Sequence, residues 1–195
     1  MRGASSRIGI LGGTFDPVHN AHLALAHAAH DQLALEKVLW MPTGKPRNRD
    51  EPIAAHGQRH AMLQLALDGE AGFEIDAREL APGASGYTVD TLHELRLELG
   101  RDTTLVLVIG ADQYEKLASW HRPDEVKRLA RIAVVKRPGF EKKIAKQTLR
   151  VEMEPLAVSG SEIRARVARG EDIGELVPAP VAAYIAEHGL YRLPS

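Results

Sequence analysis

The chain has 195 residues, of which 44% are hydrophobic and 26% charged, and its formal net charge is −1. This size and balance predict one globular domain with a substantial core, and the charge excludes a broadly basic surface for nucleic acid. The chain has no cysteine, which excludes a disulfide scaffold, a thiolate nucleophile and a cysteine-ligated metal. Neither a signal-peptide core nor a membrane-spanning apolar run is present. We therefore expect a cytoplasmic protein that does not associate with membranes or nucleic acid.

Short apolar runs alternate with amphipathic segments from one end of the chain to the other. The runs favour β-strands, and apolar residues at helical spacing favour helices that several glycines end. The predicted strands are 8–11, 37–42, 73–76, 103–112, 130–139 and 150–154. The predicted helices are 21–35, 56–69, 88–100, 161–170 and 181–189. The long polar loops 43–55 and 77–87 are candidates for ligand binding.

This alternation predicts a Rossmann-like α/β fold with a doubly wound parallel sheet and C-terminal helices, formed as one domain over 1–195. Ligands of such sheets bind beyond the carboxyl ends of the strands, at the switch point of the strand order. The segments that follow strands should therefore meet at one edge of the sheet. These segments are 12–22, 42–49, 110–120 and 136–139.

The segment "GGTFDPVHNAH" at 12–22 joins the first predicted strand to the first predicted helix. Gly12 and Gly13 allow close approach of a ligand to the backbone, so the amides near Thr14 and Phe15 can point at phosphate oxygens. His19 and His22 are three residues apart and should share one side of the first helical turn. The segment is neither a GxGxxG fingerprint nor a P-loop. A plain turn with a solvated capping histidine is the alternative, but so many such residues together favour phosphate binding.

Metal binding is a weaker interpretation of the histidines. His27 and His30 extend the run of histidines, yet structural zinc usually needs four ligands that include cysteine. The segment "HGQRH", which contains His56 and His60, lacks the glutamate of a zinc-protease helix and favours surface histidines. Asp16 is a candidate metal ligand, although a turn-forming Asp-Pro pair explains it at least as well.

Local groups of cations occur despite the neutral total charge. Lys45, Arg47 and Arg49 follow the second predicted strand, and Lys136 and Arg137 follow the fifth. Each group alone is typical of a solvated surface. Their placement at the carboxyl ends of strands favours phosphate binding.

The sequence resembles bacterial nicotinate-nucleotide adenylyltransferases, of the nucleotidyltransferase superfamily with a His-x-Gly-His-type motif. The resemblance rests on "GGTFDPVHNAHL", "ARELAPGASGYTVDTLHELRLELG", "VIGADQYEKLASWHR", "VVKRPG", "VSGSEIRARVARG" and "YIAEHGLY", so it spans nearly the whole chain. Three features depart from the family pattern. Ala21 replaces the motif glycine, Gly160 and Ser161 replace a Ser-Thr pair, and "KPRNR" replaces Pro-Pro-His-Lys.

The resemblance implies transfer of the adenylyl group of ATP to nicotinate mononucleotide, with release of pyrophosphate, in NAD biosynthesis. It implies catalytic roles for His19 and His22 and Mg²⁺ held by the ATP phosphates, with no certain protein ligand. The implied ATP-binding residues are Gly12, Gly13, Thr14, Phe15, Gly110, Asp112, Ser159, Ser161, Ile163 and Arg164. The implied nicotinate-nucleotide-binding residues are Lys45, Arg47, Tyr87, Thr88, Trp120 and Arg137. Oligomeric state stays open, as does the choice among Lys45, Arg47 and Arg49 for the mononucleotide phosphate.

Purely structural roles, in helix capping or core packing, are the alternatives to several of these assignments. Ser161 and Asp112 could be helix N-caps, Thr88 could only cap its helix, and Trp120 could only fill core. At the level of function, the alternatives are adenylyl or cytidylyl transfer to another phosphate acceptor, such as pantetheine phosphate, and a non-catalytic nucleotide sensor. An NAD-dependent oxidoreductase is weaker because the dinucleotide fingerprint is absent.

Overall fold

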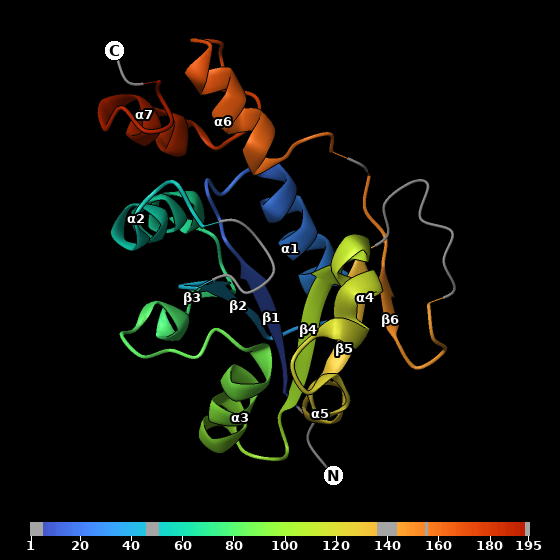
Figure 1. Ribbon diagram of the computed structural model, residues 1–195. Helices are drawn as coiled ribbons and strands as arrows, with labels where there is room; N and C mark the ends of the chain where they lie inside the picture. Colours follow the sequence, from blue (N-terminus) through green and yellow to red (C-terminus); the bar gives the residue numbers. More distant parts are fainter. Residues whose placement is uncertain (1–5, 46–50, 136–143, 155, 194–195) are drawn as a thin grey trace.

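A six-stranded parallel sheet forms the centre of the molecule (Figure 1). The computed structural model describes residues 6–45, 51–135, 144–154 and 156–193. The strand order is β3-β2-β1-β4-β5-β6, so the order reverses between β1 and β4. The strands are β1 (Arg7–Gly13), β2 (Lys37–Pro42), β3 (Phe73–Ile75), β4 (Thr104–Gly110), β5 (Arg131–Val135) and β6 (Leu149–Val151). The predicted Rossmann-like, doubly wound parallel sheet is confirmed.

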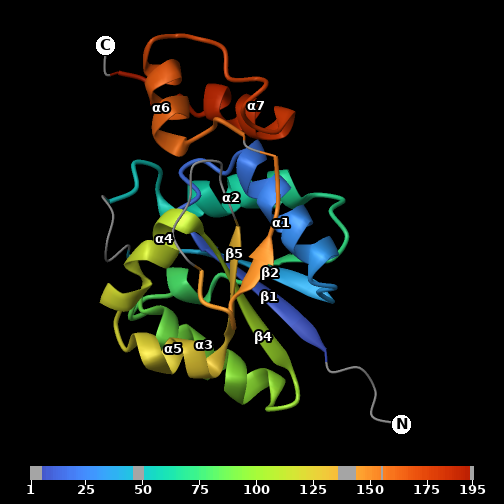
Figure 2. The ribbon, with the colours of Figure 1, turned by 90° about the vertical axis from the view of Figure 1, so that its right-hand side faces the viewer.

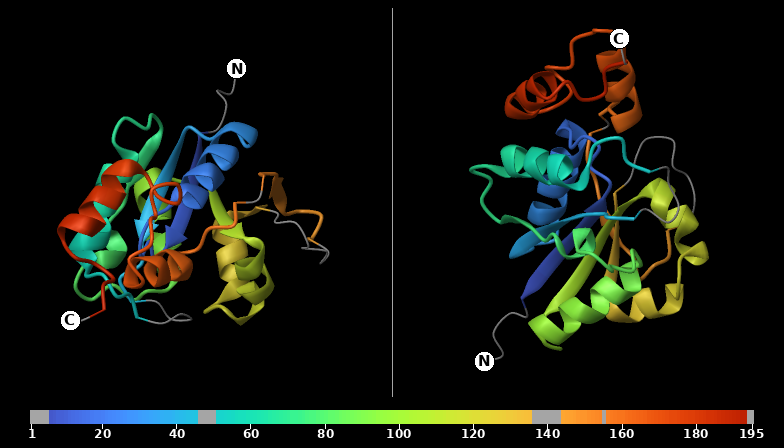
Figure 3. Two further views of the ribbon diagram at one scale, coloured as in Figure 1. Left: turned by 90° about the horizontal axis from the view of Figure 1, so that it is seen from above. Right: turned by 60° about the vertical axis from the view of Figure 1, so that its left-hand side comes forward.

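Helices cover both faces of the sheet (Figures 2 and 3). The α-helices are α1 (Asn20–Gln32), α2 (His56–Leu67), α3 (Thr88–Leu99), α4 (Ala111–Lys116), α5 (Pro123–Leu129), α6 (Gly160–Ala168) and α7 (Ala179–Glu187). Two 3₁₀ turns are η1 (Arg78–Leu80) and η2 (Leu117–Ser119). One core cluster joins the sheet to α1, α2, α6 and α7, and a second joins it to α3, α4 and α5. No helix in the described ranges is long and apolar enough to cross a membrane.

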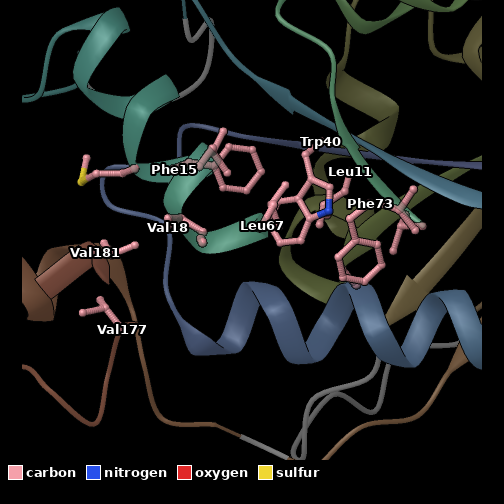
Figure 4. Packing of buried hydrophobic residues seen from close by; sticks show 14 of the residues in the cluster. Leu11, Phe15, Val18, Trp40, Leu67, Phe73, Val177 and Val181 are labelled. Atoms are coloured by element: carbon pink, nitrogen blue, oxygen red, sulfur yellow. The ribbon is translucent and has the colours of Figure 1, made fainter. Parts of the chain in front are cut away.

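The strands are apolar on both sides because both faces are covered. In β2, Val38 and Trp40 enter the first cluster, whereas Leu39 and Met41 enter the second. Trp40 lies between the rings of Phe15 and Phe73, with centroid distances of 5.4 and 5.8 Å. Figure 4 shows these three rings above α1, with Val177 and Val181 near Val18 at one end of the cluster. The C-terminal segment therefore packs into the same core as the sheet.

Several predicted boundaries are wrong for local reasons. The strand predicted over 103–112 ends at Gly110, because Ala111 and Asp112 begin α4. The helix predicted over 21–35 ends at Gln32, since Leu33 caps it and Ala34 has a positive φ of 48°. The short elements η1, α4, η2 and α5 were not expected. Residues 136–139 of the predicted fifth strand lie outside the described residues.

Candidate active site

The chain that leaves β1 forms an open loop beside the switch point. A Cβ on Gly12 would meet no heavy atom within 4 Å, so the backbone there is open to a ligand. A Cβ on Gly13 would lie 2.9 Å from the ring of Phe15, so this position needs glycine. Phe15 has a φ of 49° and turns its buried ring into the core. The loop therefore presents backbone, rather than large side chains, at the carboxyl edge of the sheet.

The two motif histidines lie against each other at the start of α1. Their ring centroids are 3.6 Å apart with an interplanar angle of 21°. The His19 amide donates a 3.3 Å hydrogen bond to Nδ1 of His22, so in the neutral His22 ring the proton lies on Nε2. His19 is the N-cap residue of α1 but is only 6% exposed. The shared side is confirmed. The alternative was right that His19 caps α1 and wrong that it is solvated.

Asp16 is held by donors from distant parts of the chain. Its carboxylate accepts hydrogen bonds from the amides of Ile53 and Ala54, at 2.8 and 3.1 Å, and from the Tyr191 hydroxyl at 2.7 Å. Burial and the neighbouring carboxylate raise the pKa of Tyr191, which keeps the hydroxyl a donor. These bonds favour the structural interpretation of Asp16 over metal ligation.

Helix α6 begins against the same loop. Its N-cap residue is Ser159, whose Oγ accepts from the Glu162 amide at 3.3 Å, so the alternative that Ser161 is the cap is wrong. The hydroxyls of Ser159 and Ser161 are exposed and 3.1 Å apart. The Gly160 departure has a steric reason, because a Cβ there would lie 3.0 Å from the Asp16 carbonyl oxygen.

Arg164 and Ile163 differ sharply in what they present to a nucleotide. Arg164 Nη1 donates a 2.6 Å hydrogen bond to the Asp16 carbonyl oxygen, and its side chain is 29% exposed. Ile163 is fully buried, and its amide bonds to the Ser159 carbonyl oxygen at 3.1 Å. Arg164 thus lies at the loop after β1. The Ile163 side chain belongs to the core, and the role of Ile163 in ATP binding stays a prediction.

The end of β4 supplies Gly110 and Asp112. Gly110 is the N-cap residue of α4, so the alternative that Asp112 is the cap is wrong. Asp112 is exposed in the first turn, where Gln113 donates to its carboxylate at 3.1 Å. A Cβ on Gly110 would lie 2.7 Å from Asp112 Oδ1, so glycine leaves room for that carboxylate. An exposed carboxylate here can accept hydrogen bonds from ribose hydroxyls.

Tyr87 and Trp120, two of the residues expected to bind the nicotinate nucleotide, both pack against the second core cluster. The rings of Tyr87 and His121 are 4.3 Å apart, which brings the start of α3 beside the end of η2. Tyr87, rather than Thr88, is the N-cap residue of α3, and it makes no capping hydrogen bond with its side chain. Trp120 is half-buried and packs against the second core cluster. The core therefore covers only part of the Trp120 ring.

The loop after β2 is fixed by a polar link that sequence reasoning missed. Glu79 accepts a 2.8 Å hydrogen bond from Thr91 and another from Thr43. Burial raises the pKa of the Glu79 carboxyl. A Cβ on Gly44 would lie only 2.1 Å from the Glu79 carbonyl oxygen, so the loop lies close against η1. This contact positions Lys45, which is exposed.

The remaining histidines have partners of their own, and four of the predicted cations cannot be placed. Arg47, Arg49, Lys136 and Arg137 lie outside the described residues. His27 pairs with Glu70 at 3.2 Å, His30 with Asp31 at 2.9 Å, and His56 contacts the Gly44 carbonyl oxygen at 2.9 Å. The described part of the chain contains no group of three or more His, Cys, Asp or Glu residues placed to hold a metal ion.

Comparison with known proteins gives the class and then the family. Residues 10–166 match the sequence profile of the family described as "Cytidylyltransferase-like". The fold is similar to a "Plasmodium falciparum nicotinic acid mononucleotide adenylyltransferase complexed with NaAD" (TM-score 0.78, 20% identity, 95% of this chain and 97% of that one). It is also similar to a "Putative Nicotinate-nucleotide Adenylyltransferase from Vibrio parahaemolyticus" (TM-score 0.70, 19% identity, 97% of each chain). The family match, together with the fold, shows a protein of the nucleotidyltransferase class.

Relatives with similar sequences identify the family within this class. A "Probable nicotinate-nucleotide adenylyltransferase" of Chromobacterium violaceum is 39% identical over 211 aligned residues, which cover 96% of this chain and all of the relative. A protein of the same name from Thermomicrobium roseum is 41% identical over 200 residues, 96% of this chain and 92% of the relative. The chain belongs to the nicotinate-nucleotide adenylyltransferase family.

Proposed function

We propose that this chain transfers the adenylyl group of ATP to nicotinate mononucleotide, giving nicotinate adenine dinucleotide and pyrophosphate. The observation that carries the proposal is the stacked His19–His22 pair beside the open backbone at Gly12. Among the residues that the structure describes, the site offers donors to phosphate and no nucleophile–base pair. That is what direct transfer between two phosphates requires.

The acceptor phosphate can attack by itself. Its second pKa is near 6, so it is largely a dianion at neutral pH and needs no general base. The reaction needs in-line placement and stabilisation of charge on the α-phosphate and the departing pyrophosphate. In this proposal the Nε2 proton of His22 and the ring of His19 donate to those oxygens. The mechanism has no covalent enzyme intermediate.

The ATP side of the site would combine the loop after β1 with α4 and α6. In this proposal the backbone at Gly12–Phe15 contacts the phosphates, Asp112 the ribose, and Ser159, Ser161 and Arg164 the β- and γ-phosphates. The Asp16 carbonyl fixes one nitrogen of Arg164 at the loop, which orients the guanidinium.

The acceptor side would lie at the start of α3. The positive end of a helix favours a carboxylate, and Thr88 begins α3 there, whereas the Tyr87 amide already donates to Ser85 Oγ at 3.1 Å. The half-buried Trp120 would stack on the pyridine ring, and Lys45 would meet the mononucleotide phosphate. Because a carboxylate accepts where a carboxamide also donates, we propose a preference for the acid over the amide.

Mg²⁺ would enter with ATP rather than reside in the protein. Asp16 is occupied by three donors, and Asp112 is the exposed carboxylate at the end of β4. This donor set fits an ion that keeps its waters and binds mainly to phosphate oxygens. When bound, Mg²⁺ neutralises phosphate charge. Since ATP and pyridine mononucleotides are cytoplasmic metabolites, we place the reaction in the cytoplasm.

A panel of acceptors tests the proposal against its alternatives. Pyrophosphate release and the product's mass are measured with ATP or CTP and with nicotinate mononucleotide or pantetheine phosphate. The proposal predicts a dinucleotide only from ATP with the nicotinate nucleotide. Faster reaction with pantetheine phosphate or CTP contradicts it, and nucleotide binding without any product supports a sensor.

A further inference from the structure

Arg59 is a fully buried arginine that contacts the loop after β1. It lies in α2, and its Nη1 donates a 2.7 Å hydrogen bond to the carbonyl oxygen of Thr14. Its Nε and Nη2 are buried and have no hydrogen-bond acceptor among the described residues. A buried cation with so few acceptors is costly to the fold. Nothing in the adenylyl transfer as derived above uses it.

Peptide geometry links this hydrogen bond to the ligand side of the loop. The Thr14–Phe15 peptide is trans, so its carbonyl and its N–H point in opposite directions. With the carbonyl held toward Arg59, the Phe15 N–H points the other way. That amide makes no hydrogen bond to the backbone of the described residues. Phe15 also touches His22 edge-on, with ring centroids 5.0 Å apart.

Arg59 faces two carboxylates that partly offset its charge. The guanidinium stays protonated: burial lowers its pKa, and the carboxylates of Asp16 and Glu51 act in the opposite direction. The Asp16 carboxylate is already bonded to two amides and to Tyr191. A fixed cation in a low-dielectric setting interacts strongly with a nearby polyanion.

We propose that Arg59 is a positioning residue, which orients the Thr14–Phe15 peptide so that its N–H faces the nucleotide phosphates. Arg59 acts through the loop and does not touch substrate. The inference rests on the proposed function, because it assumes that this loop binds the phosphates of ATP.

The test compares Arg59→Met and Arg59→Lys with the control Arg96→Met. Arg96 also caps carbonyl groups, those of Gly100, Thr103 and Leu129, but at the opposite edge of the sheet. For each variant the melting temperature, the Kd of ATP without acceptor, and kcat and KM are measured below the melting transition. Each variant disturbs hydrogen bonds from a side chain to backbone carbonyl oxygens, but only the Arg59 variants do so at the loop after β1. The comparison therefore separates loss of stability from loss of loop orientation.

Arg59→Met is expected to lower kcat/KM for ATP by about 10- to 100-fold. That is the usual cost when a residue that orients a ligand-binding group is lost. Arg59→Lys, which keeps the charge, should lose less. Arg96→Met should lower the melting temperature yet leave kcat/KM within about twofold. Unchanged ATP affinity and turnover in Arg59→Met overturns the inference. If that variant does not fold, wild-type ATP affinity in Arg59→Lys, with a lowered melting temperature, overturns it instead.

The two proposals can fail separately. If the wild-type protein makes no dinucleotide but binds ATP, the proposed function fails and the Kd of ATP in the variants still decides the role of Arg59. A wild-type protein that does not bind ATP overturns both.

Discussion

At the scale of single residues, we expect the His19–His22 pair to carry the chemistry. If both rings donate to phosphate charge that shifts during transfer, their loss should affect turnover more than binding. We expect His19→Ala and His22→Ala each to lower kcat by about 10²–10³-fold, with little change in substrate KM. Steady-state kinetics checks this, with His27→Ala, two turns along α1, as the control. Near-normal turnover in both variants would remove the histidines from catalysis.

Arg164 should act on ATP binding. Its guanidinium meets triphosphate charge in the ground state and in the transition state alike, so Arg164→Ala should raise the KM for ATP by about tenfold or more. Arg166→Ala is the matched control, because Arg166 pairs with Glu162 on the surface of the same helix at 2.9 Å. An effect on the nicotinate nucleotide alone would place Arg164 outside the ATP site.

The site residues that the sequence predicted belong to motifs whose members lie close together in the chain. Gly12, Gly13, His19 and His22 stand in one motif at a strand–helix junction. Arg59 and Tyr191 were missed because their partners lie 45 and 175 residues away. A local signal did exist for Arg59, since it occupies the buried face of α2. A charged residue at a core position predicts a buried partner without saying which one.

At the scale of elements, the six strands and the longer helices were predicted, with errors at their ends, whereas the short helical elements were not. The apolar periodicity of α3 and β4 is clear over whole segments, because both are packed against the sheet or within it. The elements η1, α4, η2 and α5 contain too few residues to show a period. Pro123 at the start of α5 is the kind of signal that could have marked one of them.

The start of α6 gives a prediction about glycine. A Cβ at Gly160 would lie 3.0 Å from the Asp16 carbonyl oxygen and 3.2 Å from Arg164 Nη1, whereas one at Gly57 in α2 would meet nothing within 4 Å. Gly57→Ala should therefore raise the free energy of unfolding by up to about 1 kcal/mol through helix propensity. Gly160→Ala should lower it and raise the KM for ATP. Urea unfolding checks both, and equal gains in the two variants would contradict the close contact.

At the scale of the whole molecule, the C-terminal helices complete the core. Ile163, Val181 and Ile185 are buried in the same cluster as Trp40 and Val106. The single domain over 1–195 stays a prediction, and truncation tests it. A chain that ends at Glu154 should lose cooperative thermal unfolding, because the apolar faces of α1 and α2 would be uncovered. A truncated chain that melts like the full one would divide the chain into two units.

The central claim is adenylyl transfer to the acid form of the pyridine mononucleotide. The most direct measurement is kcat/KM for nicotinate and nicotinamide mononucleotides with saturating ATP, in the wild type, Thr88→Ala and Trp120→Ala. We predict that the wild type prefers the acid by about tenfold or more, since a carboxamide, which also donates, pairs less well than a carboxylate with donors at the start of α3. Trp120→Ala should weaken both nucleotides alike. Equal use of acid and amide by the wild type, or no dinucleotide from either, would contradict the account.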